Sequence, residues 1–144
     1  MTNQRRQPGP PLSWLAILKA FAVWVLIGFA LGLKPYLDHV ESAGGEAVVF
    51  LAMGFMFGAT GGFIFNVLYR LQSRHSHPTH LQAVLTGISA ASVFVMINAV
   101  QAAIVPAVGS TGNADLVASA VVLAVGGVAG LLSGSLLAVP RDAA

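Results

Sequence analysis

Four long apolar segments, separated by short polar ones, dominate the pattern of this chain. They cover residues 12–33, 47–70, 80–105 and 114–139. Each is long enough for a helix that crosses the hydrocarbon core of a bilayer, which takes about 20 residues. Helices that are joined by short loops run in alternating directions. The pattern therefore predicts an all-α fold, a polytopic membrane protein with an antiparallel bundle of four transmembrane helices in a single domain.

Polar stretches define the remaining organisation. Residues 1–11 hold three prolines and one glycine and predict a flexible tail, and residues 140–144 form a second tail. Residues 34–46, with a proline, two adjacent glycines and three acids, predict the first loop. A cleaved signal peptide is an alternative for the first segment because Arg5 and Arg6 precede it, but the apolar run is long for a signal.

Basic residues collect on one predicted side of the membrane. That side holds Arg5, Arg6, Arg70, Arg74 and Arg141, whereas Lys34 lies alone on the other. Because short loops rich in Lys and Arg stay in the cytoplasm, both termini are expected there. The short loops and this asymmetry favour a multi-pass protein of the cell membrane, with the bacterial cytoplasmic membrane as the expected location.

Glycines concentrate on one face of the second segment and one face of the fourth when each is read as a helix. They are Gly54, Gly58, Gly61 and Gly62 in the second segment, and Gly126, Gly130 and Gly134 in the fourth. Small residues let helix backbones approach closely in lipid. The sequence therefore predicts that these two helices pack on each other through their glycine faces. A duplicated hairpin would give this similarity, and so would two independent packing requirements.

Composition agrees with a membrane protein. The chain is 56% hydrophobic and 8% charged, with a mean hydropathy of +0.81, whereas soluble domains carry about 25% charged residues. The net charge of +2 comes from so few residues that no nucleic-acid partner is expected. The chain contains no cysteine, which excludes disulfides, thiolate metal sites, iron–sulfur clusters and cysteine nucleophiles.

Four polar side chains are expected inside the apolar segments: Lys19, Asn66, Asn98 and Gln101. Lys19 lies close enough to one end of its segment for its stem to reach the headgroups, and an inward-facing functional lysine is the alternative. The amides suit hydrogen bonds between helices, worth about 0.6 to 2 kcal/mol each, or else the lining of a polar path or a ligand contact. Asn66 and Asn98 lie near opposite membrane surfaces, so one shared site is not expected.

Arginine and histidine residues surround the second connection. Arg70 and Arg74 are expected to contact lipid headgroups or a cytoplasmic partner. His75, His77 and His80 are weak candidates for a metal site, because imidazoles bind Zn²⁺, but their spacing matches no standard zinc pattern. A cationic loop on anionic lipid and a pH-sensitive loop are the alternatives.

Missing groups narrow the functional classes. Asp115 stands at the start of the fourth segment, and no Asp or Glu lies further inside any of the four. The carboxylate relay of coupled transporters is therefore not expected. No Ser-His-Asp set or HExxH motif is visible, so no enzymatic activity is predicted. No cofactor is predicted either, and the composition is compatible with a bound lipid.

The leading hypothesis is a non-enzymatic membrane subunit. It would be a structural, accessory or assembly component of a membrane complex, or a homo-oligomer, held through its Gly-rich helix faces. Its partners would be the lipid bilayer and other membrane subunits or copies of itself. The alternative is a small oligomeric channel or facilitator for ions or small solutes, lined by Thr60, Asn66, Asn98 and Gln101. A lipid-linked enzyme or lipid carrier that uses Lys19, Arg70 and Arg74 on lipid headgroups is a third hypothesis.

Overall fold

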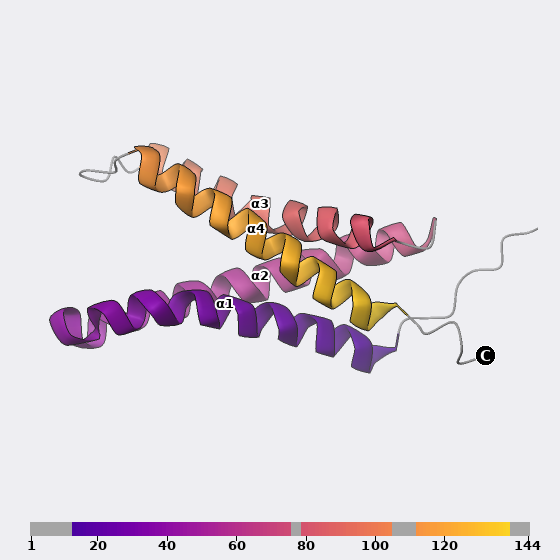
Figure 1. Ribbon diagram of the computed structural model, residues 1–144, viewed down its shortest axis with the longest axis horizontal. Helices are drawn as coiled ribbons and strands as arrows, with labels where there is room; N and C mark the ends of the chain where they lie inside the picture. Colours follow the sequence, from indigo (N-terminus) through magenta and orange to yellow (C-terminus); the bar gives the residue numbers. More distant parts are fainter. Residues whose placement is uncertain (1–12, 76–78, 105–111, 139–144) are drawn as a thin grey trace, which may run out of the picture.

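The computed structural model of the chain describes residues 13–75, 79–104 and 112–138, and residues 98–104 and 112–115 by their backbone alone. This part of the chain contains four long α-helices and one short 3-10 helix (Figure 1). They are α1 (Trp14–Ala43), η1 (Gly44–Ala47), α2 (Val48–Ser73), α3 (His80–Ile104) and α4 (Gly112–Leu137).

The length and apolar composition of these helices suit a membrane. Within the described residues, three continuous helical stretches are long and apolar enough to cross one: Trp14–Ser73, His80–Ile97 and Leu116–Leu137. The first stretch contains both α1 and α2, which reverse direction at η1 (Figure 1). The predicted all-α fold of antiparallel, membrane-length helices is therefore confirmed.

The first helix, α1, runs well past the end that the apolar pattern predicts. Most of the predicted loop at 34–46 is helical, as far as Ala43, with Pro35 inside the helix. Proline removes one backbone donor from this turn. The same turn carries an ion pair between Lys34 and Asp38, whose Nζ and Oδ2 atoms lie 2.6 Å apart. Ion pairs between residues four apart support a helix. Polar composition here marks the end of the apolar surface rather than the end of the helix.

Both ends of α1 are capped. The side chain of Ser13 accepts a hydrogen bond of 3.2 Å from the N–H of Ala16, as an N-cap residue does. At the other end, Gly44 has a φ of 55° and its N–H donates to the carbonyl of Val40. Glycine adopts this φ without steric cost, so it ends the helix and begins the turn into α2.

The four helices form two hairpins, α1 with α2 and α3 with α4. Between the hairpins, α1 contacts α4 and α2 contacts α3, whereas α2 and α4 barely touch. The hairpins lie close together around the start of α1 and the end of α4, and they diverge toward η1 and the end of α3 (Figure 1). Packing between the hairpins is therefore concentrated toward one end of the molecule.

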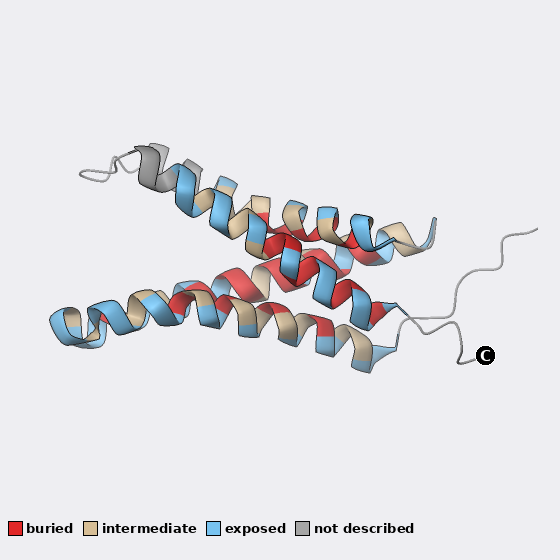
Figure 2. Cartoon of the chain, viewed as in Figure 1, coloured by how far each residue is buried: buried red, intermediate tan, exposed pale blue. Residues whose placement is uncertain are grey.

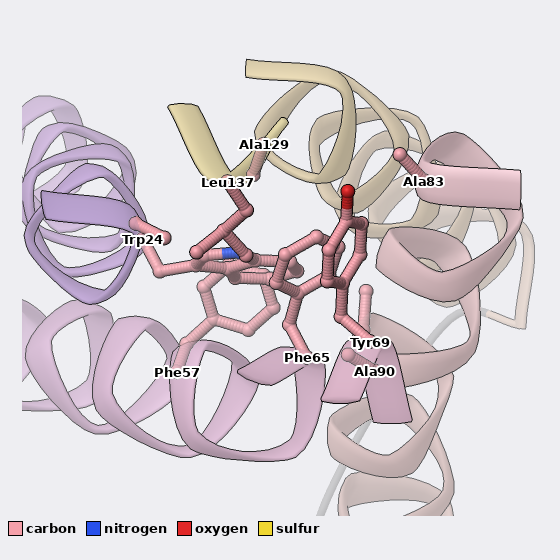
Figure 3. Packing of buried hydrophobic residues seen from close by; sticks show 10 residues of the cluster. Trp24, Phe57, Phe65, Tyr69, Ala83, Ala90, Ala129 and Leu137 are labelled. Atoms are coloured by element: carbon pink, nitrogen blue, oxygen red, sulfur yellow. The ribbon is translucent and has the colours of Figure 1, made fainter. Parts of the chain in front are cut away.

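The buried core lies where the two hairpins meet (Figure 2). At its centre is Trp24 of α1, which is 0% exposed. Its ring centroid lies 6.1 Å from that of Phe57 and 5.8 Å from that of Phe65, both on α2. Tyr69 of α2 and Leu137 of α4 lie beside these rings (Figure 3). The ring of Phe57 also lies 5.1 Å, centroid to centroid, from that of Phe94 of α3, so large side chains join the hairpins.

Candidate functional site

Glycines bring the backbones of α1 and α2 into direct contact. A Cβ atom on Gly58 would lie 2.5 Å from the carbonyl oxygen of Trp24 and 2.8 Å from Cα of Val25. A Cβ atom on Gly28 would likewise meet the backbone of Gly54. A larger residue at these positions requires a helix to move, so the close contact depends on glycine.

The next two glycines of α2, Gly61 and Gly62, make room for the side chain of Trp24. A Cβ atom on Gly61 would lie 2.5 Å from Cζ3 of Trp24, and one on Gly62 would lie 2.9 Å from Cβ of Trp24. Both glycines are buried. They therefore admit the indole side chain into the core rather than a second backbone.

The contact between α3 and α4 repeats the arrangement of the first hairpin. A Cβ atom on Gly130 would lie 2.5 Å from the carbonyl oxygen of Ala83 and 2.7 Å from Cα of Gly87. Cβ atoms on Gly126 and Gly134 would also meet α3, in the second case at Cβ of Ala83. Each hairpin is thus closed by small residues on both of its helices.

The prediction that α2 and α4 pack on each other through their glycine faces is wrong. The glycines of α2 face α1 and those of α4 face α3, while α2 and α4 barely touch. The reason lies in the first helix of each hairpin, which carries its own small residues one turn apart. These are Gly28 and Gly32 in α1, and Ala83, Gly87 and Ala91 in α3. Each glycine face therefore finds a matching face on its neighbour in the same hairpin.

Two hydrogen bonds join the hairpins among the side chains that the structure describes. Ser133 Oγ of α4 donates to the carbonyl oxygen of Ala20 in α1, at 3.2 Å in a buried position. Thr86 Oγ1 of α3 lies 2.9 Å from Gln72 Oε1 of α2 and 2.6 Å from the carbonyl oxygen of Gln82. These polar contacts fix how one hairpin sits against the other.

The predicted intramembrane polar residues have different environments. Lys19 is exposed on the surface of α1. Asn66 is buried, and its Nδ2 donates to the carbonyl oxygen of Gly62 at 2.8 Å. Its Oδ1 is buried without a hydrogen-bond partner. Asn98 and Gln101 lie on the helical backbone of α3, but their side chains are outside the described part.

An apolar groove of about 300 Å³ lies between the first half of α1 and the second half of α2. It is lined by Trp14, Ile17, Leu18, Phe21, Phe63, Asn66, Val67 and Arg70. The guanidinium carbon of Arg70 lies over the ring of Trp14, 5.8 Å from its centroid. Of the two arginines that the sequence assigns to headgroups or a partner, Arg70 lines this groove and Arg74 is exposed outside it.

The histidines near the second connection remain on the surface. His75 and His80 are exposed, and His75 Nδ1 lies 3.0 Å from the carbonyl oxygen of Leu71. His77 is outside the described residues. Within the described ranges, no three His, Cys, Asp or Glu side chains are grouped so that they could hold a metal ion. The described geometry therefore adds no support to the weak metal candidate.

Comparisons with protein families, curated proteins and solved structures give no match. A role for this chain therefore rests on its own geometry. No pattern in the sequence assigned a contact to Trp24, whose ring packs on Phe65 within the first hairpin, or to Thr86 and Ser133, whose hydroxyls join the hairpins. One signal was present for Trp24, because it continues the four-residue series of Gly28 and Gly32 on α1.

Proposed function

We propose that the protein is a non-enzymatic membrane subunit. It acts as a structural, accessory or assembly component that associates with other membrane proteins or with copies of itself. One observation carries this proposal: faces of α3 and α4 that are buried where the hairpins meet become exposed where the hairpins diverge.

The change of burial is seen at matched positions. On α4, Ala129 is 0% exposed, whereas Ala118, three turns earlier and about 20° away at 100° per residue, is exposed. On α3, Ala90 is 1% exposed, whereas Ile97, two turns later on nearly the same side, is 45% exposed. No described side chain of the second hairpin is buried within residues 92–97 and 116–125.

Such uncovered faces suit a partner helix. In lipid, helices associate through close packing and hydrogen bonds rather than through the hydrophobic effect. The small-residue contacts hold the two helices of each hairpin together, so the diverging ends of the hairpins, here called the arms, do not need to cover each other. A helix of a partner that enters between the arms gains contacts with both hairpins at once.

Charge distribution supports four membrane crossings with both termini in the cytoplasm of a bacterial cell. Arg70 and Arg74 lie at the C-terminal end of α2. The described acids Asp38, Glu41 and Glu46 lie at the other end of the α1–α2 hairpin, around η1. This is the asymmetry of an inner-membrane protein. The chain lacks cysteine, so single cysteines report the orientation directly.

Two single-cysteine variants test that orientation. In intact cells, a membrane-impermeant thiol reagent should label Ser42→Cys and should leave His75→Cys unlabelled. Both positions are exposed in the structure, so a difference between them reports the side of the membrane. Labelling of His75→Cys from outside the cell would contradict the proposed orientation.

The core also bears on the channel alternative. Trp24, Phe57 and Phe65 fill the centre of the junction between the hairpins (Figure 3). Apolar rings at this position favour a packing role over a polar path through one bundle. A flux assay on liposomes that contain the protein alone tests this directly, and solute or ion flux above that of empty liposomes would favour the channel.

A photo-crosslinking experiment tests the association. A photoreactive amino acid replaces Ala118 on the uncovered face, and Val128, which is 57% exposed on α4, serves as the control. We expect a discrete adduct with a second copy, or with one co-purifying membrane protein, from position 118 and none from position 128. A monomer in mild detergent with no adduct from position 118 would refute the proposal.

A further inference from the structure

The groove between α1 and α2 combines an apolar wall with one cationic group. Six of its eight lining residues are aliphatic or aromatic: Trp14, Ile17, Leu18, Phe21, Phe63 and Val67. Along α1, the lining extends over about 10 Å at 1.5 Å per residue. Its volume of about 300 Å³ lies at the lower end of the range for small-molecule sites. The groove therefore suits part of a long, narrow apolar chain.

The cation stands at the end of this groove. Arg70 belongs to the last turn of α2, and helical side chains lean toward the N-terminus of their helix, here over the turn of Asn66. Trp14 packs against the guanidinium from the side of α1. The one ion pair in the described part of the chain joins Lys34 and Asp38. Arg70 is thus positioned by an aromatic ring without neutralisation by an acid.

A polar group lies one turn deeper in the same groove. Asn66 is 9% exposed and lines the groove. Its Nδ2 uses one hydrogen for the carbonyl oxygen of Gly62, and an amide nitrogen carries two. Its Oδ1 is also unpaired. The protein itself therefore does not use the full hydrogen-bonding capacity of this buried amide, which is costly to leave unused.

We propose that this groove binds one anionic phospholipid. The phosphate pairs with Arg70, the ester region lies beside Asn66 one turn deeper, and part of an acyl chain lies along the apolar wall. The order of groups in the groove, from cation to amide to apolar surface, matches the order of groups in a phospholipid. This site is independent of the proposed subunit role, since it lies on the first hairpin, away from the uncovered arms of α3 and α4.

Tryptophan fluorescence offers a direct test with the full chain. Of the two tryptophans, Trp14 is 81% exposed and Trp24 is 0% exposed. Bromine atoms on the acyl chains next to the ester groups, the part of the chain nearest Trp14, quench by contact, so quenching in vesicles reports lipid at Trp14. Phosphatidylglycerol and phosphatidylcholine, each brominated in turn in mixed vesicles of the two, give a relative binding constant. We expect a preference of about fivefold for phosphatidylglycerol, the factor for about 1 kcal/mol per basic side chain.

Three variants identify the site. Arg70→Gln should reduce the preference to about one, whereas Arg74→Gln, which changes an exposed charge outside the groove, should retain it. Val67→Phe adds volume to the groove wall without a change of charge and should also lower the preference. Circular dichroism of each variant in the same vesicles confirms that it is folded.

Several results would overturn the proposal. A wild-type preference near one would do so, as would equal losses in Arg70→Gln and Arg74→Gln, which would indicate general surface charge. Loss of the preference on addition of excess inorganic phosphate would show a site for free anions rather than for a lipid. A preference that survives in both Arg70→Gln and Val67→Phe would place the lipid elsewhere.

Discussion

The contact between Gly58 and α1 gives the sharpest test of the fold. In Gly58→Ala, the new methyl group would lie 2.5 Å from the carbonyl oxygen of Trp24 and 2.8 Å from Cα of Val25, whereas ordinary contacts begin at about 3.4 Å. Both neighbours are backbone atoms of a long helix and cannot turn away as a side chain can. The two helices of the first hairpin must therefore move apart.

The expected size of the effect follows from two opposing terms. Overpacking of a close contact costs about 1 to 3 kcal/mol. Alanine regains up to about 1 kcal/mol of helix propensity relative to glycine. Because both neighbours are backbone atoms, we take the upper part of the overpacking range, about 2 to 3 kcal/mol, and expect Gly58→Ala to lower the free energy of unfolding by about 1 to 2 kcal/mol. Helix propensity without the close contact predicts the opposite sign, so the sign alone distinguishes the two explanations.

Unfolding in mixed micelles with increasing SDS, followed by tryptophan fluorescence, measures this change, because Trp24 lies at the contact. Gly45→Ala is the control, since no atom lies within 4 Å of the position that its new methyl group would take, and its free energy of unfolding should change by less than about 0.5 kcal/mol. Gly127→Ala should fall between them, because its nearest neighbour, at 3.3 Å, is a side-chain atom of Ile88. Equal stability of Gly58→Ala and wild type would refute the close backbone contact.

Three further predictions use the same unfolding assay. Ser133→Ala removes the hydrogen bond to α1 and should cost about 0.6 kcal/mol, with an upper bound of about 1.7 kcal/mol, whereas Ser135→Ala, whose hydroxyl bonds within its own helix, should cost less. Trp24→Ala should cost about 3 to 5 kcal/mol, and Trp24→Phe much less, because the buried Nε1 has no partner to lose within the described residues; for these two variants, which lack the reporter ring, circular dichroism follows the unfolding. Gly44→Ala should cost about 1 kcal/mol from its φ of 55° alone, and an unchanged stability would show that this helix end rearranges freely.

The apolar pattern predicts the helices because a bilayer imposes a minimum length on each crossing. The apolar pattern predicts the end of α1 poorly, because the segment from Lys34 to Ala43 is polar and yet helical. A helix continues outside the apolar layer when its side chains support it, as the pair of Lys34 and Asp38 does. Hydropathy reports where the apolar surface ends, which is a different property from where the backbone hydrogen bonds end.

The glycine partners were not predictable from the glycines alone. A face of small residues indicates that a backbone approaches, but it does not identify which one. The matching signal was present in the first helix of each hairpin, as Gly28 and Gly32 in α1 and as Ala83 and Gly87 in α3. Alanine weakens the signal in α3, because it is common on every helix face. The groove was not predictable either, since Trp14 and Arg70 are far apart in sequence and meet only when the hairpin closes.

The two kinds of contact in this molecule have different sensitivities to change. Within each hairpin, backbone lies on backbone at the glycines, so added volume is harmful there. Between the hairpins, the rings of Phe57 and Phe94 and the hydroxyls of Ser133 and Thr86 make the contact, so truncation is harmful there instead. Gly58→Ala should therefore loosen one hairpin, while Phe94→Ala should separate two hairpins that each remain closed. A cross-link between cysteines at the η1 end of α1 and α2 should form readily in Phe94→Ala and slowly in Gly58→Ala. Equal rates would show that the hairpins are not separate packing units.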